Sequence, residues 1–186
     1  HLGDDATRRF DRVLRDIIGS GSDHWIEALR ERPKGKPFFF WLASNDPHRP
    51  FESVEGYPSY DLSKVVVPPF LPDVAETRGE FTLYYRRISR LDDNVGRVLA
   101  ELETQKVSDR TVVLFVSDNG APFPRAKVTV YDSGIATPLL VRYPRMVRPG
   151  SVSLGLVSAV DIAPTILELA GRTPPPTIQG KSFARL

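Results

Sequence analysis

The sequence contains no cysteine, which excludes disulfide bonds, thiolate metal ligands and a cysteine nucleophile within this chain and leaves the redox compartment open. No apolar run approaches the roughly 18 residues that a membrane span needs, and the first residues lack the pattern of a signal peptide. An excess of one charge is also missing, because 25 basic and 23 acidic side chains are interspersed and give a net charge of +2. Without a basic face, nothing in the sequence indicates binding to nucleic acid.

Apolar residues are plentiful, at 41% of the 186 residues, as is typical of a globular chain that buries one core. In four segments they recur at helical spacing, which predicts helices at about residues 7–18, 25–29, 73–105 and 161–169. Asp73 and Glu76 are placed for a capping box at the start of the longest of these helices, and Asp161 for a cap on the last.

Four further segments are predicted as strands: 37–43, 111–116, 138–143 and 152–160. The first two are continuous apolar runs separated by the longest predicted helix, and this order is the βαβ pattern of a parallel sheet with right-handed crossovers. The proline-rich residues 52–72 fit neither element and predict a surface excursion or lid. We therefore expect an α/β fold, with a partial, mixed but mainly parallel sheet flanked by helices.

Polar residues follow two of the predicted strands directly. Residues 111–116 end in Ser117-Asp118-Asn119-Gly120, and in open α/β sheets the carboxyl ends of strands are where ligands bind. The same residue types also serve as ordinary turns, and this pattern alone favours a turn over a ligand site. Residues 37–43 are followed by His48, which lies between Pro47 and Pro50 and is either a reactive side chain or an ordinary solvated one.

With these segments in place, the chain resembles the sulfatase family, within the alkaline-phosphatase-like superfamily of metal-dependent ester hydrolases. The resemblance rests on four stretches in order: PFFFWLASNDPHRPF, then RLDDNVGRVLAELE followed by DRTVVLFVSDNG, then KVTVYDSGIATPLLVRYP, then SAVDIAPTILELAGRTPPPTIQGKSF. Within the family, the NDPHR, YDLSKVVVPPFLPD and DNGAPFP stretches are most similar to the heparan N-sulfatase (sulfamidase) branch and its bacterial relatives.

The resemblance implies a role for four residues. Asp118 and Asn119 match the pair that binds the active-site divalent cation, usually Ca²⁺ with Mg²⁺ as the alternative, and oxygen donors of this kind suit both ions. His48 matches a catalytic histidine near the leaving group, and Lys127 matches a lysine that contacts the sulfate. Both are therefore expected to act in catalysis and in substrate binding, the substrate being a sulfated carbohydrate or another sulfate ester.

One part of the family pattern is missing. The family's nucleophile is a formylglycine made from Cys or Ser in a C/S-x-P-x-R motif, and no such motif occurs in this sequence. We therefore interpret residues 1–186 as the C-terminal half of a sulfatase catalytic domain, with the nucleophile in an upstream half. The complete protein would hydrolyse sulfuric esters or sulfamates of a sugar, and this chain alone would be inactive.

Two other readings of the resemblance stay open. The same metal pair serves phosphodiesterases and phosphonate monoester hydrolases of the superfamily, and a non-catalytic sulfatase-like binding domain is the alternative from another class. Relatives are commonly exported or lysosomal, which is the compartment that the resemblance implies.

Overall fold

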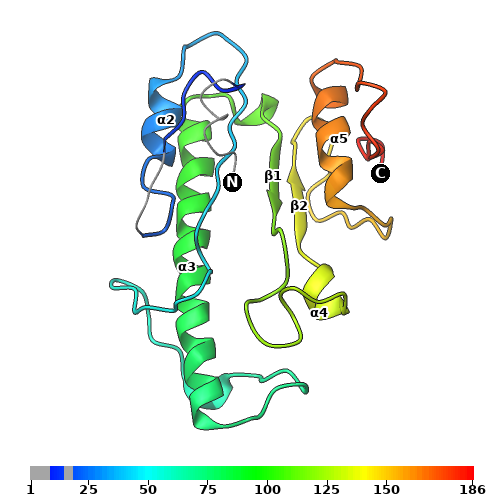
Figure 1. The fold of residues 1–186 in the computed structure, drawn as a ribbon. Helices are drawn as coiled ribbons and strands as arrows, with labels where there is room; N and C mark the ends of the chain where they lie inside the picture. Colours follow the sequence, from blue (N-terminus) through cyan, green and yellow to red (C-terminus); the bar gives the residue numbers. More distant parts are fainter. Residues whose placement is uncertain (1–8, 15–18) are drawn as a thin grey trace.

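The computed structural model describes residues 9–14 and 19–186 (Figure 1). Its regular elements, in chain order, are α2 (Trp25–Glu31), η2 (Leu62–Lys64), α3 (Ala75–Thr104), η3 (Ser108–Arg110), β1 (Val113–Val116), α4 (Asp132–Ile135), β2 (Leu139–Arg142), η4 (Ala159–Asp161) and α5 (Ile162–Leu169). None of the helices in this part of the chain has the length and apolar character that crossing a bilayer requires.

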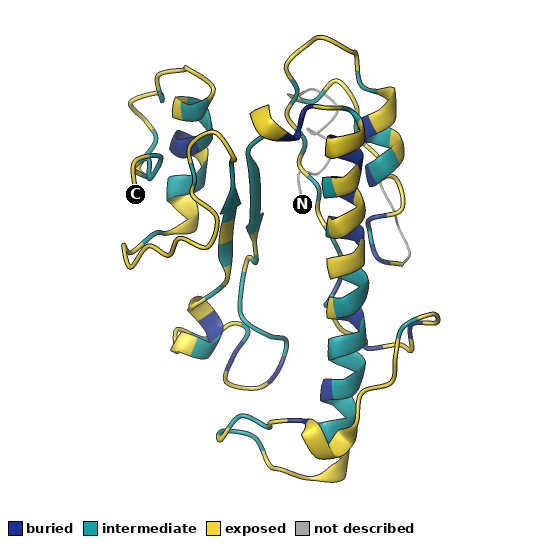
Figure 2. Cartoon of the chain, turned by 180° about the vertical axis from the view of Figure 1, so that it is seen from behind, coloured by how far each residue is buried: buried dark blue, intermediate teal, exposed yellow. Residues whose placement is uncertain are grey.

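The 30-residue helix α3 runs along the long axis of the molecule and carries both hydrophobic clusters. The helix predicted at residues 73–105 is confirmed, and buried positions recur along its length (Figure 2). Towards its C-terminal end it packs against α2 in a cluster of Trp25, Leu29, Val98, Leu102 and Val107. Leu29 is only 2% exposed, so the short helix α2 is held by this packing, since seven residues are too few for a stable isolated helix.

The second hydrophobic cluster lies towards the N-terminal end of α3 and consists mainly of aromatic rings. It contains Phe51, Val65, Phe81 and Phe123, which come from four separate segments of the chain. Phe81 of α3 stacks on Phe123 with ring centroids 4.2 Å apart and an angle of 7° between the planes. This cluster therefore joins the loop after β1 to α3. Val65 attaches the predicted surface excursion, residues 52–72, to the same cluster, and the one regular element of that excursion is the short helix η2.

The sheet of the described chain consists of β1 and β2, which pair antiparallel from Val113 opposite Arg142 to Val116 opposite Leu139. The two strands lie within the predicted segments, but the prediction of mainly parallel pairing is wrong for them. Apolar periodicity indicates a strand without indicating its direction. Direction follows from the path of the connection, and here residues 117–138 bring the chain back beside β1 in the opposite direction.

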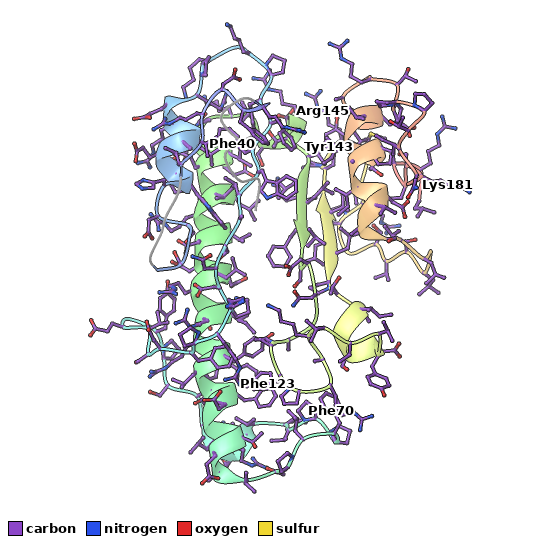
Figure 3. The ribbon with its side chains drawn as sticks, in the orientation of Figure 1. Phe40, Phe70, Phe123, Tyr143, Arg145 and Lys181 are labelled. Atoms are coloured by element: carbon purple, nitrogen blue, oxygen red, sulfur yellow. The ribbon has the colours of Figure 1, made fainter. Side chains whose placement is uncertain are left out.

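Residues 37–43 were predicted as a strand buried on both faces, and this prediction is wrong for the described chain. The segment lies alongside α3 without pairing (Figure 1). Phe38, Phe40 and Leu42 pack against the cluster between α2 and α3, as the label of Phe40 in Figure 3 shows. Phe39 and Trp41 point away and are 54% and 68% exposed. A run of apolar residues therefore became a strand only where a second strand lay beside it.

Three smaller predictions were corrected. Part of the helix predicted at residues 7–18 lies outside the described residues, and residues 10–14 are not helical. Asp73 does not cap α3; its carboxylate binds Arg78, with Nη2 to Oδ2 at 2.7 Å, and the N-cap is Val74. Residues 152–158 form no strand, and Val152 and Leu154 are largely exposed. The helix predicted after Asp161 is confirmed as α5.

The carboxylate of Asp46 is the one acidic side chain in the described ion pairs that is fully buried, at 0% exposure. Arg90 donates to it from Nε at 2.6 Å and from Nη2 at 2.7 Å, and Arg87 donates from Nη1 at 3.2 Å. The hydrogen bond to Asp46 is the main cause that raises the pKa of Arg90 above its usual value. These contacts fix the loop of residues 44–50 to the middle of α3.

A second constraint fixes the loop after β1. Gly120 donates its backbone N–H to the carbonyl of Gly134 at 2.8 Å. The backbones approach so closely that a Cβ on Gly120 would lie 1.9 Å from the Ser133 carbonyl oxygen, and a Cβ on Gly134 would lie 2.4 Å from the carbonyl oxygens of Ala126 and Thr129. Only glycine fits at these two positions, and together they bring residues 120–129 against α4.

Replacing Asp46 by Asn should lower the free energy of unfolding by about 3 to 5 kcal/mol, because two arginines would then lose their buried counter-charge. Urea unfolding followed by circular dichroism measures the change. The matched control is Asp109→Asn, since Asp109 pairs with Arg145 at 2.9 Å but both side chains are more than half exposed. The control should leave the urea midpoint nearly unchanged. An equal effect of the two substitutions would contradict the assigned importance of the Asp46 cluster.

Candidate functional site

Two of the four residues assigned by resemblance meet at one pocket. The pocket has a volume of about 310 Å³ and lies between the loop after residues 37–43 and the loop after β1. Its lining consists of His48, Arg49, Pro122, Phe123, Pro124, Lys127 and Val128. Phe123, labelled in Figure 3, extends from the second loop towards α3. His48 and Lys127 are 79 positions apart in the sequence and share this pocket because both loops are fixed to the same helix.

The imidazole of His48 is exposed and its orientation is set by a backbone contact. Nδ1 lies 2.5 Å from the carbonyl oxygen of Arg49. Because a carbonyl oxygen only accepts hydrogen bonds, Nδ1 must carry a proton, and Nε2 is the nitrogen that remains for a ligand. The ion pairs of Asp46, two residues earlier, hold the loop that carries His48, so its exposed imidazole has a fixed place on the surface.

Lys127 brings a positive charge that is not neutralised by any carboxylate of the described chain. Its side chain is half-buried, and its ammonium group forms no hydrogen bond or ion pair with the residues that the structure describes. The next residue, Val128, has a φ of 60°, a strained backbone conformation for a β-branched residue, and is 94% exposed. Lys127 and Val128 both line the pocket.

Asp118 and Asn119 follow β1 as predicted but do not line this pocket. The Asp118 carboxylate is exposed and has no partner in the described part of the chain. Asn119 donates from Nδ2 to the Gly120 carbonyl at 2.7 Å, which leaves its amide oxygen for a ligand. Free oxygen donors on neighbouring residues fit a hard cation such as Ca²⁺ or Mg²⁺.

These two residues can form only part of a coordination shell. Ca²⁺ takes six to eight oxygen ligands and Mg²⁺ takes six. Over residues 9–14 and 19–186, no group of three or more His, Cys, Asp or Glu side chains is placed to hold a metal ion. Asp118 and Asn119 thus fit the cation chemistry in kind, and the rest of the shell must come from other groups.

Two residues with a role in the site were missed at the sequence level. Asp46 anchors the His48 loop, and Arg49 lines the pocket beside His48. A signal for Asp46 was present, since Arg87 and Arg90 lie three positions apart on α3 and so share the face that packs inwards. No sequence pattern pointed to Arg49, whose guanidinium contacts the distant residues Pro122, Glu80 and Phe123 and the nearby ring of Phe51.

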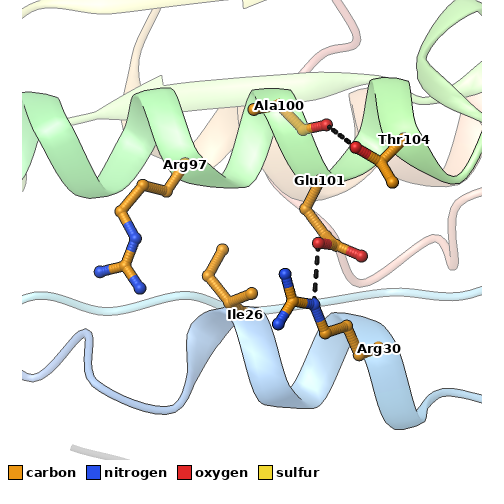
Figure 4. A pocket seen from close by; sticks show the side chains of 6 residues that line it. All are labelled: Ile26, Arg30, Arg97, Ala100, Glu101 and Thr104. Carbon is orange, nitrogen blue, oxygen red and sulfur yellow. Dashed lines mark hydrogen bonds and ion pairs between the residues drawn. The ribbon is translucent and has the colours of Figure 1, made fainter.

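A second pocket, of about 260 Å³, lies between α2 and α3 (Figure 4). Its polar groups are already satisfied: Arg30 donates from Nε to Glu101 at 2.9 Å, and Arg97 donates to Asn94 at 3.1 Å. Hydrogen bonds, first from Gln105 and then from Arg30, lower the pKa of the Glu101 carboxyl. The pocket contains none of the residues predicted for a site, and its ion pair joins the two helices.

The chain matches the sulfatase family model over residues 18–172. It is 36% identical over 156 residues to human N-sulphoglucosamine sulphohydrolase, a match that covers 72% of this chain and 31% of that protein. It is also 36% identical over 121 residues to an ulvan-active sulfatase of Formosa agariphila, covering 65% of this chain and 20% of that protein. The chain thus spans about a fifth to a third of the length of these relatives.

Solved structures show the same relationship. A protein studied for the metabolism of multiple glycosaminoglycans by Bacteroides thetaiotaomicron superimposes with a TM-score of 0.77 at 27% identity, over 88% of this chain and 37% of that chain. A second, solved in complex with its substrate D-glucosamine-2-N,6-O-disulfate, gives a TM-score of 0.52 at 32% identity, over 58% of this chain and 24% of that chain. The predicted α/β class is confirmed, and the chain belongs to the sulfatase family.

Proposed function

We propose that the complete protein containing this sequence hydrolyses sulfate esters or sulfamates of a sugar, and that this chain supplies the C-terminal half of the catalytic domain. Family membership supports the type of hydrolase. The observation that carries the proposal is the pocket that Lys127 shares with His48, since the ammonium group of Lys127 has no ion pair among the residues that the structure describes. Such a pocket favours an anionic group, because the anion would supply a counter-charge for the ammonium group of Lys127.

Each of these two residues has a distinct task in the proposed reaction. Lys127 would donate to a sulfate oxygen and offset the negative charge of the transferring sulfuryl group, an electrostatic role that commonly dominates such catalysis. His48, with Nδ1–H bound to the Arg49 carbonyl, would use Nε2–H in its protonated form to protonate the departing oxygen or nitrogen. The apolar walls formed by Phe123 and the neighbouring prolines would limit water around the anion.

Asp118 and Asn119 would bind the divalent cation, for which Ca²⁺ is the first candidate and Mg²⁺ the second. A cation bound there would supply Lewis-acid polarisation of a sulfuryl oxygen. Their free oxygens and their place at the carboxyl end of β1 support this assignment.

The sugar part of the substrate is proposed from the relatives. One relative is named for N-sulphoglucosamine, and one solved relative holds D-glucosamine-2-N,6-O-disulfate as its substrate. A sulfated amino sugar is therefore the first substrate class to test. The sulfamate and the sulfate ester of such a sugar differ in the leaving atom, and His48 can protonate either nitrogen or oxygen.

In the complete protein, Lys127→Ala should reduce kcat for a sulfated glucosamine by about 10²- to 10³-fold, because one transition-state contact is lost. His48→Ala should reduce it by about 10²- to 10⁴-fold through loss of the proton donor. Sulfate release measured by ion chromatography gives both values.

The matched control is Lys64→Ala, since Lys64 is an exposed lysine of η2 outside the pocket. Unchanged kcat in both site variants would reject the assignment, and release of phosphate from phosphodiesters in place of sulfate would favour the phosphodiesterase alternative.

Asp118→Ala should weaken Ca²⁺ binding to the complete protein at least about tenfold, since a carboxylate is the strongest single donor of the pair. Isothermal titration with CaCl₂ measures the affinity directly and does not depend on turnover. Asp132→Ala is a suitable control because Asp132 is an exposed aspartate on the neighbouring helix α4. Equal Ca²⁺ affinity in wild type and Asp118→Ala would remove Asp118 from the proposed shell.

This chain alone, supplied with CaCl₂, should release no sulfate from an arylsulfate or from a sulfated glucosamine. The reason is chemical: the sequence has neither cysteine nor a Ser-x-Pro-x-Arg motif from which a formylglycine could form. The complete protein serves as the positive control in the same assay. Turnover by the chain alone would show that the division of the site between two halves is wrong, whereas inactivity of the complete protein would favour a binding domain.

A further inference from the structure

Arg49 connects three segments that are distant in the sequence. Its Nε donates to the carbonyl oxygen of Pro122 at 2.8 Å, in the loop that carries Lys127. Its Nη1 lies 2.7 Å from Oε2 of Glu80, in the first part of α3. Its own backbone carbonyl accepts the hydrogen bond from Nδ1 of His48. One residue thus contacts the histidine, the loop of the lysine and the helix that supports both.

The guanidinium of Arg49 also covers the aromatic cluster. Its central carbon lies 4.5 Å from the ring centroid of Phe51 and 5.2 Å from that of Phe123. Phe123 is 7% exposed and stacks on Phe81 from the other direction. Cation–π contacts of this kind stabilise the ring beneath, so Arg49 keeps Phe123 inserted and shields the cluster on the pocket side.

The loop that carries Lys127 has few other anchors. The backbone hydrogen bonds of Phe123, Ala126 and Lys127 all go to carbonyls within the loop itself, at Ala121 and Phe123. Among the described residues, Arg49 is the only side chain from outside residues 117–135 that donates a hydrogen bond to this loop. The separation between Lys127 and His48 is therefore set largely by Arg49 and the ring of Phe123.

We propose that Arg49 is a positioning residue whose guanidinium fixes the loop of Lys127 beside the segment that carries His48, so that both reach one anion. This inference rests on the function proposed above for His48 and Lys127. Glu80 pairs with the guanidinium, and Pro122 and two rings occupy its other sides. Arg49 is thus committed to protein contacts and is not a free cation for the substrate.

The first test is hydrogen exchange in the complete protein, which needs no substrate. Arg49→Ala should speed exchange of the amides of residues 121–128 about tenfold, the equivalent of losing a hydrogen bond to a charged donor. Glu80→Gln, which leaves Arg49 in place without its counter-charge, should act in the same direction but more weakly. Unchanged exchange in residues 121–128 of Arg49→Ala would overturn the proposal.

Arg86→Ala is the matched control. Arg86 belongs to α3, and its guanidinium binds a different loop through the Pro58 carbonyl and the hydroxyls of Ser53 and Ser59. Its loss should speed exchange in residues 53–59 and leave residues 121–128 unchanged. A general loosening of the protein, as opposed to release of one loop, would appear in both loops and would contradict a specific role for Arg49.

The second test separates positioning from substrate binding by kinetics. Arg49→Ala should lower kcat for a sulfated glucosamine by about 10- to 100-fold with KM changed less than about threefold, since misplaced catalytic groups act mainly on the chemical step. Arg49→Lys keeps a cation over the rings but lacks the planar fork, so it should recover part of the loss. A rise in KM at constant kcat would overturn the proposal and assign Arg49 to substrate binding.

The two tests also separate this proposal from the proposed function. If the wild-type complete protein releases no sulfate from any sulfated sugar, the proposed function fails, and the exchange comparison still decides whether Arg49 holds the loop. If the wild type is active and the Arg49→Ala variant retains full kcat, the proposed function stands and the positioning role is refuted.

Discussion

The arrangement of this chain depends on the buried carboxylate of Asp46 and its two arginine partners on α3. A fully desolvated carboxylate is costly unless it is paired, so the loop that contains Asp46 has one favourable position along the helix. That position places His48, two residues later, beside the loop that follows β1. A buried ion pair of this kind contributes specificity of placement more clearly than net stability.

The aromatic cluster fixes the second half of the site in a different way. Phe123 inserts between Phe51 and Phe81, and this hydrophobic contact determines where the loop of Lys127 lies. The close approach at Gly120 and Gly134 fixes the other end of the same loop. Charge pairing thus holds one loop, ring packing holds the other, and Arg49 joins the two.

The candidate site belongs to a chain of the sulfatase family that covers only part of the length of its relatives. Lys127 and His48 line a single pocket, and Asp118 and Asn119 lie a short distance away along the loop that carries Lys127. Two oxygen donors leave a cation shell unfilled. The pocket of Lys127 and His48, together with only two oxygen donors at Asp118 and Asn119, is the basis for proposing that other residues complete the site.

The sequence by itself determined the helices α3 and α5, the two strands, and the four residues proposed for the site, because periodicity and short motifs are local properties. It also indicated the family. Only the tertiary structure decided that β1 and β2 pair antiparallel, that residues 37–43 stay unpaired, and that Asp73 binds Arg78. It alone revealed Arg49. Strand pairing and ion pairs depend on which distant segments become neighbours, and packing against α3 settles that question where no local pattern can.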